Sequence, residues 1–276
     1  MLKDSKVAIL GTGTMGRALG QGMVKAGVID SSRIRGTVKH DRELEQVSTQ
    51  VEFAVGTDNA AAVRDADIVL LCTKPRDARA LLKDLADTGA LSHEPLLISI
   101  VAGVSTSELE AAAGGSLRVV RAMPNTPCLV GAGMVVLTSG SGAEKEDLEL
   151  AKAVFGPLGR VICLDEEHMD AVTGLSGSGP AFVYVIIEAL SEGGVMTGLP
   201  RAVATEMAAQ TVHGAARMVL DTGRHPAALK DEVTTPAGCT ISALLSLEDG
   251  RLRSVLARGV QEAARSAADL GRNGRE

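Results

Sequence analysis

Apolar and polar residues alternate along the first 164 residues in a pattern that predicts a sheet with helices on its faces. Short β-rich runs recur between helical segments, and they are VAIL at 7–10, IRGTV at 34–38, VEFAV at 51–55, DIVLLC at 67–72, LLISI at 96–100, LRVVRA at 117–122 and MVVLT at 134–138. Strands that alternate with helices form a parallel sheet. The runs at 67–72 and 96–100 are almost wholly apolar, which is typical of central strands covered on both faces.

The pattern changes at His168. From there through Leu270, segments rich in Ala, Leu and Met follow helical spacing. We therefore predict an α/β domain over residues 1–164 and an all-α domain over residues 165–276. The predicted helices 178–197 and 200–221 carry little charge for their length, so we expect another protein surface to bury them, including that of a second subunit.

Composition narrows the choice of partners. The formal net charge is -6, and no long run of Lys and Arg offers a surface for nucleic acid. No apolar stretch is expected to approach the roughly 20 residues of a membrane helix, and the first residues, MLKDSK, are too polar for a signal peptide. We expect a cytoplasmic protein that binds neither nucleic acid nor membrane. With aromatic residues at 1%, its ligand must be held by backbone and small polar groups.

The four cysteines do not suggest a metal site or a disulfide framework. Cys72, Cys128, Cys163 and Cys239 lie far apart and form no CxxC pair. We expect all four to be small buried hydrophobic residues and predict no metal.

A glycine turn follows the first strand and opens the predicted helix 14–27. Its six residues are Gly11, Thr12, Gly13, Thr14, Met15 and Gly16. In this motif the first glycine permits the tight turn, the second lets a pyrophosphate approach the backbone, and the third lets helix and strand pack closely. The helix N-terminus then faces the phosphates. We predict a Rossmann-type domain that binds a nicotinamide dinucleotide through these six residues, and hence an oxidoreductase.

The residues after the second strand bear on the choice of cofactor. NAD-binding domains usually place an acidic residue there to bond the ribose hydroxyls. Here the strand runs into Lys39, His40, Asp41 and Arg42. Lys39, His40 and Arg42 can pair with a 2′-phosphate, which favours NADP(H), whereas Asp41 keeps NAD(H) possible. A solvated surface loop is the alternative for each of them.

Three more loops follow predicted strands. Thr73-Lys74-Pro75 and Val101-Ala102-Gly103 stand at carboxyl ends of parallel strands, the edge where open α/β sheets bind ligands. Pro75 is expected to begin a helix. Two prolines around Asn125 predict either a rigid polar loop or simply a shaped turn.

The helical domain has two predicted helix starts that suit an anion. Pro180 stands early in one helix, so the amides before it and Ser178 are expected to face a carboxylate, unless this start only packs on the sheet. The other start follows KDEVTTPAGCT at 230–240, which is rich in hydroxyl groups. Two such starts beside a dinucleotide fold suggest a small carboxylated substrate.

Five segments together resemble pyrroline-5-carboxylate reductase over nearly the whole chain. They are VAILGTGTMG, DNAAAVRDADIVLLCTKP, RAMPNTP, GLSGSGPAFVY and HPAALKDEVTTPAGCTISALLSLE. The last is the most specific, because its Asp-x-Val-x-x-Pro-x-Gly-x-Thr pattern is the family's signature. The resemblance implies the final step of proline biosynthesis, in which hydride from NAD(P)H reduces the cyclic imine 1-pyrroline-5-carboxylate to L-proline.

The resemblance also implies roles for single residues. Asn59 would contact the adenosine half of the cofactor, and the nicotinamide side would be lined by Thr73, Lys74, Pro75, Ala102 and Gly103. The substrate would be surrounded by Thr235, Gly238, Cys239 and Thr240, with backbone amides on its carboxylate and the Thr240 hydroxyl near the ring nitrogen. Ala237 departs from the family, which often has glycine there. Family members form homodimers through an interleaved helical domain, and the dimers can assemble into a ring.

Two other functions compete with this interpretation. The 3-hydroxyacid dehydrogenases have a similar architecture but carry a catalytic Lys on the helix after a GxxGxG turn, where this chain has Val183. A non-catalytic cofactor-binding protein is the other alternative, and the intact hydroxyl-rich loop argues against it. Reduction of an iminium needs no strong base, which agrees with a chain that places none in an obvious catalytic loop.

Overall fold

The first part of the chain folds around an eight-stranded sheet in the computed structural model, which describes residues 2–273. The strands are β1 (Val7–Leu10), β2 (Ile34–Thr37), β3 (Ala54–Gly56), β4 (Ile68–Leu71), β5 (Leu96–Ser99), β6 (Val119–Met123), β7 (Gly133–Ser139) and β8 (Gly159–Cys163). Their order is β3-β2-β1-β4-β5-β6-β7-β8, so the order reverses between β1 and β4. Ligands of open α/β sheets bind at the carboxyl ends of the strands beside such a reversal.

The α/β fold class is confirmed, with two differences at one edge of the sheet. Strands β1 to β6 are parallel, as predicted, but β7 runs antiparallel to β6 and β8 runs parallel to β7. β8 itself was not predicted.

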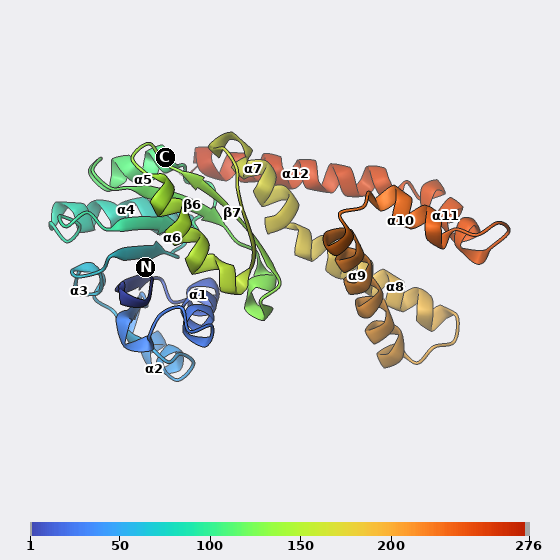
Figure 1. Cartoon of the computed structure of the whole chain (residues 1–276), viewed down its shortest axis with the longest axis horizontal. Coiled ribbons are helices and arrows are strands. Elements are labelled where there is room, and N and C mark those ends of the chain that lie inside the picture. The colour runs from blue at the N-terminus through green and yellow to red at the C-terminus, as the bar shows by residue number, and fades with distance from the viewer. Residues whose placement is uncertain (1, 274–276) are drawn as a thin grey trace. The chain divides into compact units, whose positions relative to one another are not determined.

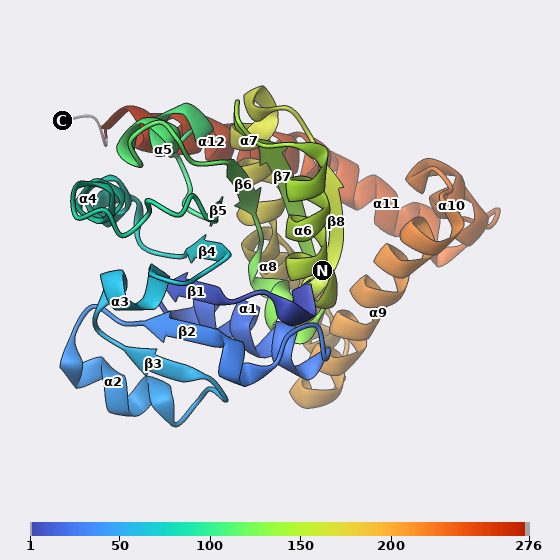
Figure 2. The same ribbon diagram turned by 60° about the vertical axis from the view of Figure 1, so that its left-hand side comes forward.

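Helices cover both faces of the sheet (Figure 2). In chain order they are α1 (Thr14–Lys25), α2 (Asp41–Ser48), α3 (Asn59–Val63), α4 (Pro75–Asp87), α5 (Thr106–Ala112) and α6 (Lys145–Phe155). Successive strand side chains point to opposite faces. Accordingly, Ile9 shares a buried cluster with Leu19 of α1 and Phe155 of α6, whereas its neighbour Leu10 shares another with Leu82 of α4.

The chain leaves the sheet through an unbroken helical run, not through a new helix start. A π-helical turn (Thr173–Gly177) links α7 (Met169–Val172) to α8 (Gly179–Met196). The Ser178 amide donates to the Thr173 carbonyl at 2.9 Å. The prediction of exposed helix-start amides before Pro180 is therefore wrong.

Pro180 explains the change of helical pitch. Proline has no amide to donate, and its ring crowds the carbonyl four residues earlier. That carbonyl belongs to Ser176, and it accepts a 3.0 Å hydrogen bond from the side-chain amide of Asn125. The side-chain oxygen of Asn125 also accepts a 3.0 Å hydrogen bond from the Met134 amide. Of the two predictions for the segment around Asn125, a rigid polar loop or a shaped turn, the structure shows a shaped turn, held by these two hydrogen bonds.

The chain divides into two compact units, with bounds that differ from those of the predicted domains. One unit runs to Ser178 and resumes at Glu262, and the other is Gly179–Gln261. Residues 165–178 belong with the sheet because Met169 and Val172 pack against Val136 of β7.

A buried ion pair also ties residues 165–178 to the sheet. The Arg121 side chain is 5% exposed, and its Nη1 donates to Oε1 of Glu166 at 2.6 Å. The other carboxylate oxygen of Glu166 accepts the Thr106 amide at 3.3 Å. Losing one partner of such a pair leaves a buried charge uncompensated, which is strongly destabilising.

The second unit is helical. It contains α8, α9 (Arg201–Thr222), α10 (Pro226–Val233), α11 (Cys239–Asp249) and the start of α12 (Leu252–Asn273) (Figure 1). α8 and α9 pack against each other, and the hydroxyls of Ser191 and Thr205 bond across them at 2.8 Å. A Cβ added to Gly194 would lie 3.0 Å from that of Ala204, so small residues set this close approach.

α8 and α9 also carry many exposed apolar side chains. They include Tyr184, Val185, Leu190, Met196, Val203, Met207, Met218 and Leu220. By length and composition alone, one helical run within residues 2–273, Glu166–Met196, is apolar enough to cross a membrane. This differs from the expectation that no apolar stretch is long enough. Large apolar side chains exposed in such number on two helices are typical of a site of protein or membrane contact.

Candidate active site

The glycine turn has the geometry that its sequence predicts. Gly11 has φ +95°, and a Cβ there would lie 2.9 Å from the Cys72 carbonyl oxygen. A Cβ on Gly16 would lie 2.4 Å from the Gly11 carbonyl oxygen, so only glycine lets α1 approach the turn. By contrast, a Cβ on Gly13 would meet nothing within 4 Å, and no side chain caps α1. Open space beside an uncapped helix N-terminus is suited to a phosphate.

Thr37, the last residue of β2, connects three parts of this edge. Its carbonyl accepts the Thr12 amide at 2.7 Å, and its hydroxyl donates to Oδ1 of Asn59 at 2.7 Å. Asn59, the first residue of α3, is thereby fixed beside the glycine turn with its side-chain NH₂ left for other partners. Thr37 was not predicted; the available signal was a hydroxyl residue at the carboxyl end of the strand that follows the glycine turn and its helix.

The basic residues after β2 lie at the same edge. Lys39, His40 and Arg42 are exposed. The Nζ of Lys39 lies 2.9 Å from Oδ1 of Asp77 in the first turn of α4. Asp77 was not predicted, because nothing in the sequence indicates that a residue of α4 meets the loop after β2.

The loops after β4 and β5 complete this edge. α4 begins at Pro75 as predicted, with Lys74 as its N-cap. Among the described residues, the buried hydroxyl of Thr73 has no hydrogen-bond partner. Thr73 lies next to the glycine turn, because a Cβ placed on Gly11 would lie 3.2 Å from the Thr73 amide nitrogen. Ala102 and Gly103 follow β5 and are partly buried. The unpaired hydroxyl and the open space at Gly13 fit a polar, phosphate-bearing ligand, as a dinucleotide is.

The hydroxyl-rich loop in the second unit forms a tight turn before α11. The Gly238 amide donates to the Thr235 carbonyl at 3.0 Å, which closes a four-residue β-turn. Ala237 stands at its third position with φ +57°, where a type II turn calls for glycine. Alanine at this position therefore costs backbone strain. A Cβ on Gly238 would lie 2.5 Å from the Thr235 hydroxyl and 3.1 Å from the Thr235 carbonyl oxygen, so a larger residue there would displace the Thr235 side chain.

The turn leads directly into α11, a helix without a side-chain N-cap. Cys239 and Thr240 are the first two residues of α11, and no side chain caps their amides. Thr240 is half-buried. An anion is stabilised at such a helix start by the free amides and by the helix dipole. Ser178 lies in the helical run with its amide already bonded, so only its hydroxyl remains for a ligand.

Two of the four cysteines differ from their predicted state. Cys128 is buried as predicted, and Cys72 is partly buried; desolvation raises the pKa of the Cys72 thiol to about 12. Cys163 and Cys239 are exposed, so the prediction of four buried cysteines is wrong for these two. All four thiols are free. Within residues 2–273, no group of three or more His, Cys, Asp and Glu side chains is placed to hold a metal.

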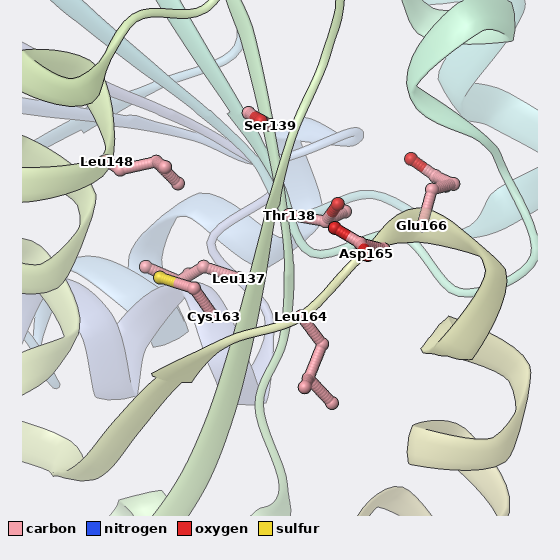
Figure 3. A pocket seen from close by; sticks show the side chains of 8 residues that line it. All are labelled: Leu137, Thr138, Ser139, Leu148, Cys163, Leu164, Asp165 and Glu166. Atoms are coloured by element: carbon pink, nitrogen blue, oxygen red, sulfur yellow. The ribbon is translucent and has the colours of Figure 1, made fainter.

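A cavity of about 240 Å³ lies elsewhere, beside β7 and β8 (Figure 3). It is lined by Leu137, Thr138, Ser139, Leu148, Cys163, Leu164, Asp165 and Glu166, none of them a predicted site residue. The predicted residues of the first unit instead lie along the open carboxyl edge of the sheet, which is where extended dinucleotides bind.

An open sheet with a glycine turn at its switch point and polar groups along one edge defines a Rossmann-type, dinucleotide-dependent oxidoreductase. The pyrroline-5-carboxylate reductase of Methanosarcina acetivorans is 41% identical over 98% of this chain and 100% of its own length. The chain belongs to the pyrroline-5-carboxylate reductase family. The corresponding protein of Arabidopsis thaliana is 39% identical over 96% of this chain and 95% of its own.

Two family models divide the chain between them. Pyrroline-5-carboxylate reductase dimerisation matches residues 166–270, and NADP oxidoreductase coenzyme F420-dependent matches residues 6–103. The crystal structure of the Plasmodium falciparum pyrroline carboxylate reductase with NADP bound is also similar. It has a TM-score of 0.88 and 30% identity, and the match covers 98% of this chain and 100% of that one.

Proposed function

We propose that this chain reduces 1-pyrroline-5-carboxylate to L-proline, the last step of proline biosynthesis, with a nicotinamide cofactor. One observation carries the substrate assignment. The tight turn Thr235–Gly238 opens into an uncapped helix whose first turn also presents the Thr240 hydroxyl. That arrangement offers amides for a carboxylate and a hydroxyl for a neighbouring nitrogen.

This reaction requires the chain to position the substrate more than to activate it. Reduction adds a hydride to the imine carbon and a proton to its nitrogen. The bound dinucleotide supplies the hydride. The protonated imine is already electrophilic, so the residues of the chain need only to hold it in register and keep its nitrogen hydrogen-bonded.

The substrate is assigned to the second unit's loop. Amides at the start of α11 bind its carboxylate, and Thr240, the catalytic residue, bonds the ring nitrogen through its hydroxyl. Thr235, Gly238 and Cys239 shape the loop around it, and Ser178 contributes its hydroxyl. We propose a functional division into a dinucleotide-binding domain at 1–164 and a domain for substrate binding and dimerisation at 165–276; it differs from the two compact units because residues 165–178 pack on the sheet.

The cofactor is assigned to the edge of the sheet. The glycine turn, Gly11 to Gly16, holds the pyrophosphate, and Asn59, oriented by Thr37, bonds the adenosine half. The nicotinamide side is lined by Thr73, Lys74, Pro75, Ala102 and Gly103. This assignment gives the unpaired Thr73 hydroxyl a partner.

Steady-state assay of the purified protein tests this function. We expect oxidation of NADPH or NADH that depends on 1-pyrroline-5-carboxylate, with L-proline as the product by amino-acid analysis. A protein that binds NADPH but oxidises none of it with this substrate would be a non-catalytic binding protein, and the proposal would be wrong.

The cofactor preference is proposed to be for NADP(H), with NAD(H) also accepted. Lys39, His40 and Arg42 supply basic groups after β2, where the adenosine ribose lies in this fold. We expect Lys39→Ala and Arg42→Ala each to weaken NADPH binding about fivefold or more while NADH binding is kept, since each removes a charge-assisted contact to the 2′-phosphate. Titration of both cofactors measures this. If neither variant weakens NADPH selectively, no phosphate pocket exists here.

We propose a homodimer through α8 and α9, and a ring of such dimers as the larger assembly. The exposed apolar side chains of these helices support the dimer, because a second copy would bury them. The same burial accounts for the apolar run Glu166–Met196 without a membrane. The free thiols of Cys163 and Cys239 support a reducing compartment, which we propose to be the cytoplasm.

A further inference from the structure

Lys39 and Asp77 form an ion pair that spans the end of β1. Lys39 follows β2, and Asp77 lies in the first turn of α4, which follows β4. β1 lies between these strands in the sheet. The pair, at 2.9 Å, thus joins the two sides of the glycine turn at the edge assigned to the cofactor.

Asp77 is the acidic centre of a basic cluster. Its second oxygen, Oδ2, lies 3.8 Å from Nε of Arg76. The hydrogen bond from Lys39, together with the nearby charges of Lys39, Arg76 and Lys74, lowers the pKa of Asp77. The carboxylate is therefore ionised at neutral pH and offsets one of three positive charges. His40 and Arg42 follow Lys39 in the chain, and Asp41 stands between them.

Another anion can readily replace Asp77 as the partner of Lys39. The Lys39 side chain is 61% exposed and that of Asp77 is 32% exposed. Solvent screens such exposed pairs, so they contribute little to stability. A doubly charged phosphate nearby would compete with the carboxylate for Lys39.

We infer that Asp77 sets the balance between NADPH and NADH, by holding Lys39 as an internal counter-ion and by repelling the 2′-phosphate. This inference rests on the proposed phosphate role of Lys39. NADH, which has no 2′-phosphate, neither needs Lys39 nor meets this repulsion. Asp77 thus reduces the advantage of NADPH and lets one site accept both cofactors.

Asp77→Asn tests this, since it removes the charge and keeps the shape. We expect NADPH to bind about fivefold more tightly and NADH to be almost unaffected. The dissociation constants are measured by calorimetry, and 2′,5′-ADP against 5′-ADP as competitors isolates the phosphate. The gain should shrink at about 0.5 M salt, where charges a few ångströms apart are screened. A purely structural effect of the substitution would not depend on salt in this way.

Asp87→Asn is the matched control, because Asp87 is on the same helix and pairs with Lys83 at 2.6 Å. It should leave both dissociation constants unchanged. If Asp77→Asn changes neither cofactor, or weakens NADPH, Asp77 does not act as a competitor and the inference is overturned. Lys39→Ala separates the two proposals. If it leaves NADPH binding intact, the proposed phosphate role of Lys39 is wrong, and the inference about Asp77 falls with it. If it weakens NADPH while Asp77→Asn has no effect, only the role of Asp77 is wrong.

Discussion

Replacing Thr240 by alanine is expected to lower kcat about 100-fold while the dissociation constant of NADPH stays unchanged. Thr240 lies in the first turn of α11, half-buried, after the turn that ends at Gly238. Its hydroxyl is the group proposed to bond the imine nitrogen as the charge on that nitrogen is lost. The cofactor is assigned to other residues, so its binding should survive. Initial rates and a separate binding titration measure the two effects.

Thr234→Ala is the matched control within the same loop. The Thr234 hydroxyl already donates to the Lys230 carbonyl at 2.9 Å, so its proton is not available to a substrate. We expect Thr234→Ala to keep nearly the full rate, and Thr240→Ser to restore most of what alanine loses. Unchanged turnover in Thr240→Ala would remove this hydroxyl from the mechanism.

The sequence predicted those features that depend on neighbours along the chain. The three glycines of the first turn have distinct local signatures, and the structure gives Gly11 its positive φ and Gly16 its close contact. Pro75 likewise begins α4 as expected. In each case the requirement is set by backbone geometry within a few residues.

Features that depend on distant partners were missed. Asp77 meets Lys39 from 38 residues away, and Glu166 meets Arg121 from 45 residues away. The helix start expected before Pro180 is also absent, because the Asn125 side chain serves the carbonyl that proline leaves free. A proline signal alone does not separate a helix start from a π-turn within a longer helix.

The exposed cysteines show the same limit. Cys163 ends β8, a strand that was not predicted, and Cys239 begins α11; both are exposed. Composition favours burial of cysteine on average. It does not say which cysteine is covered, because that depends on how the elements pack.

A methyl group on Gly13 is expected to abolish most cofactor binding and leave the fold intact. Gly13 has φ -75°, which alanine adopts without strain, and its Cβ would meet no atom within 4 Å. That space is assigned to the pyrophosphate, whose close approach to the backbone a methyl would block. We expect Gly13→Ala to weaken NADPH and NADH alike by about 100-fold, because the pyrophosphate is common to both.

Alanine substitutions at two other glycines serve as controls for Gly13→Ala. Gly156, just after α6, also has open space where a Cβ would go, so Gly156→Ala should bind both cofactors normally. Gly16→Ala places a methyl 2.4 Å from the Gly11 carbonyl oxygen, so it should lower the melting temperature as well as cofactor binding. Thermal unfolding and calorimetric titration together separate these outcomes. Normal cofactor binding by folded Gly13→Ala would show that the turn does not hold the pyrophosphate, because the methyl would then stand in space that no ligand uses.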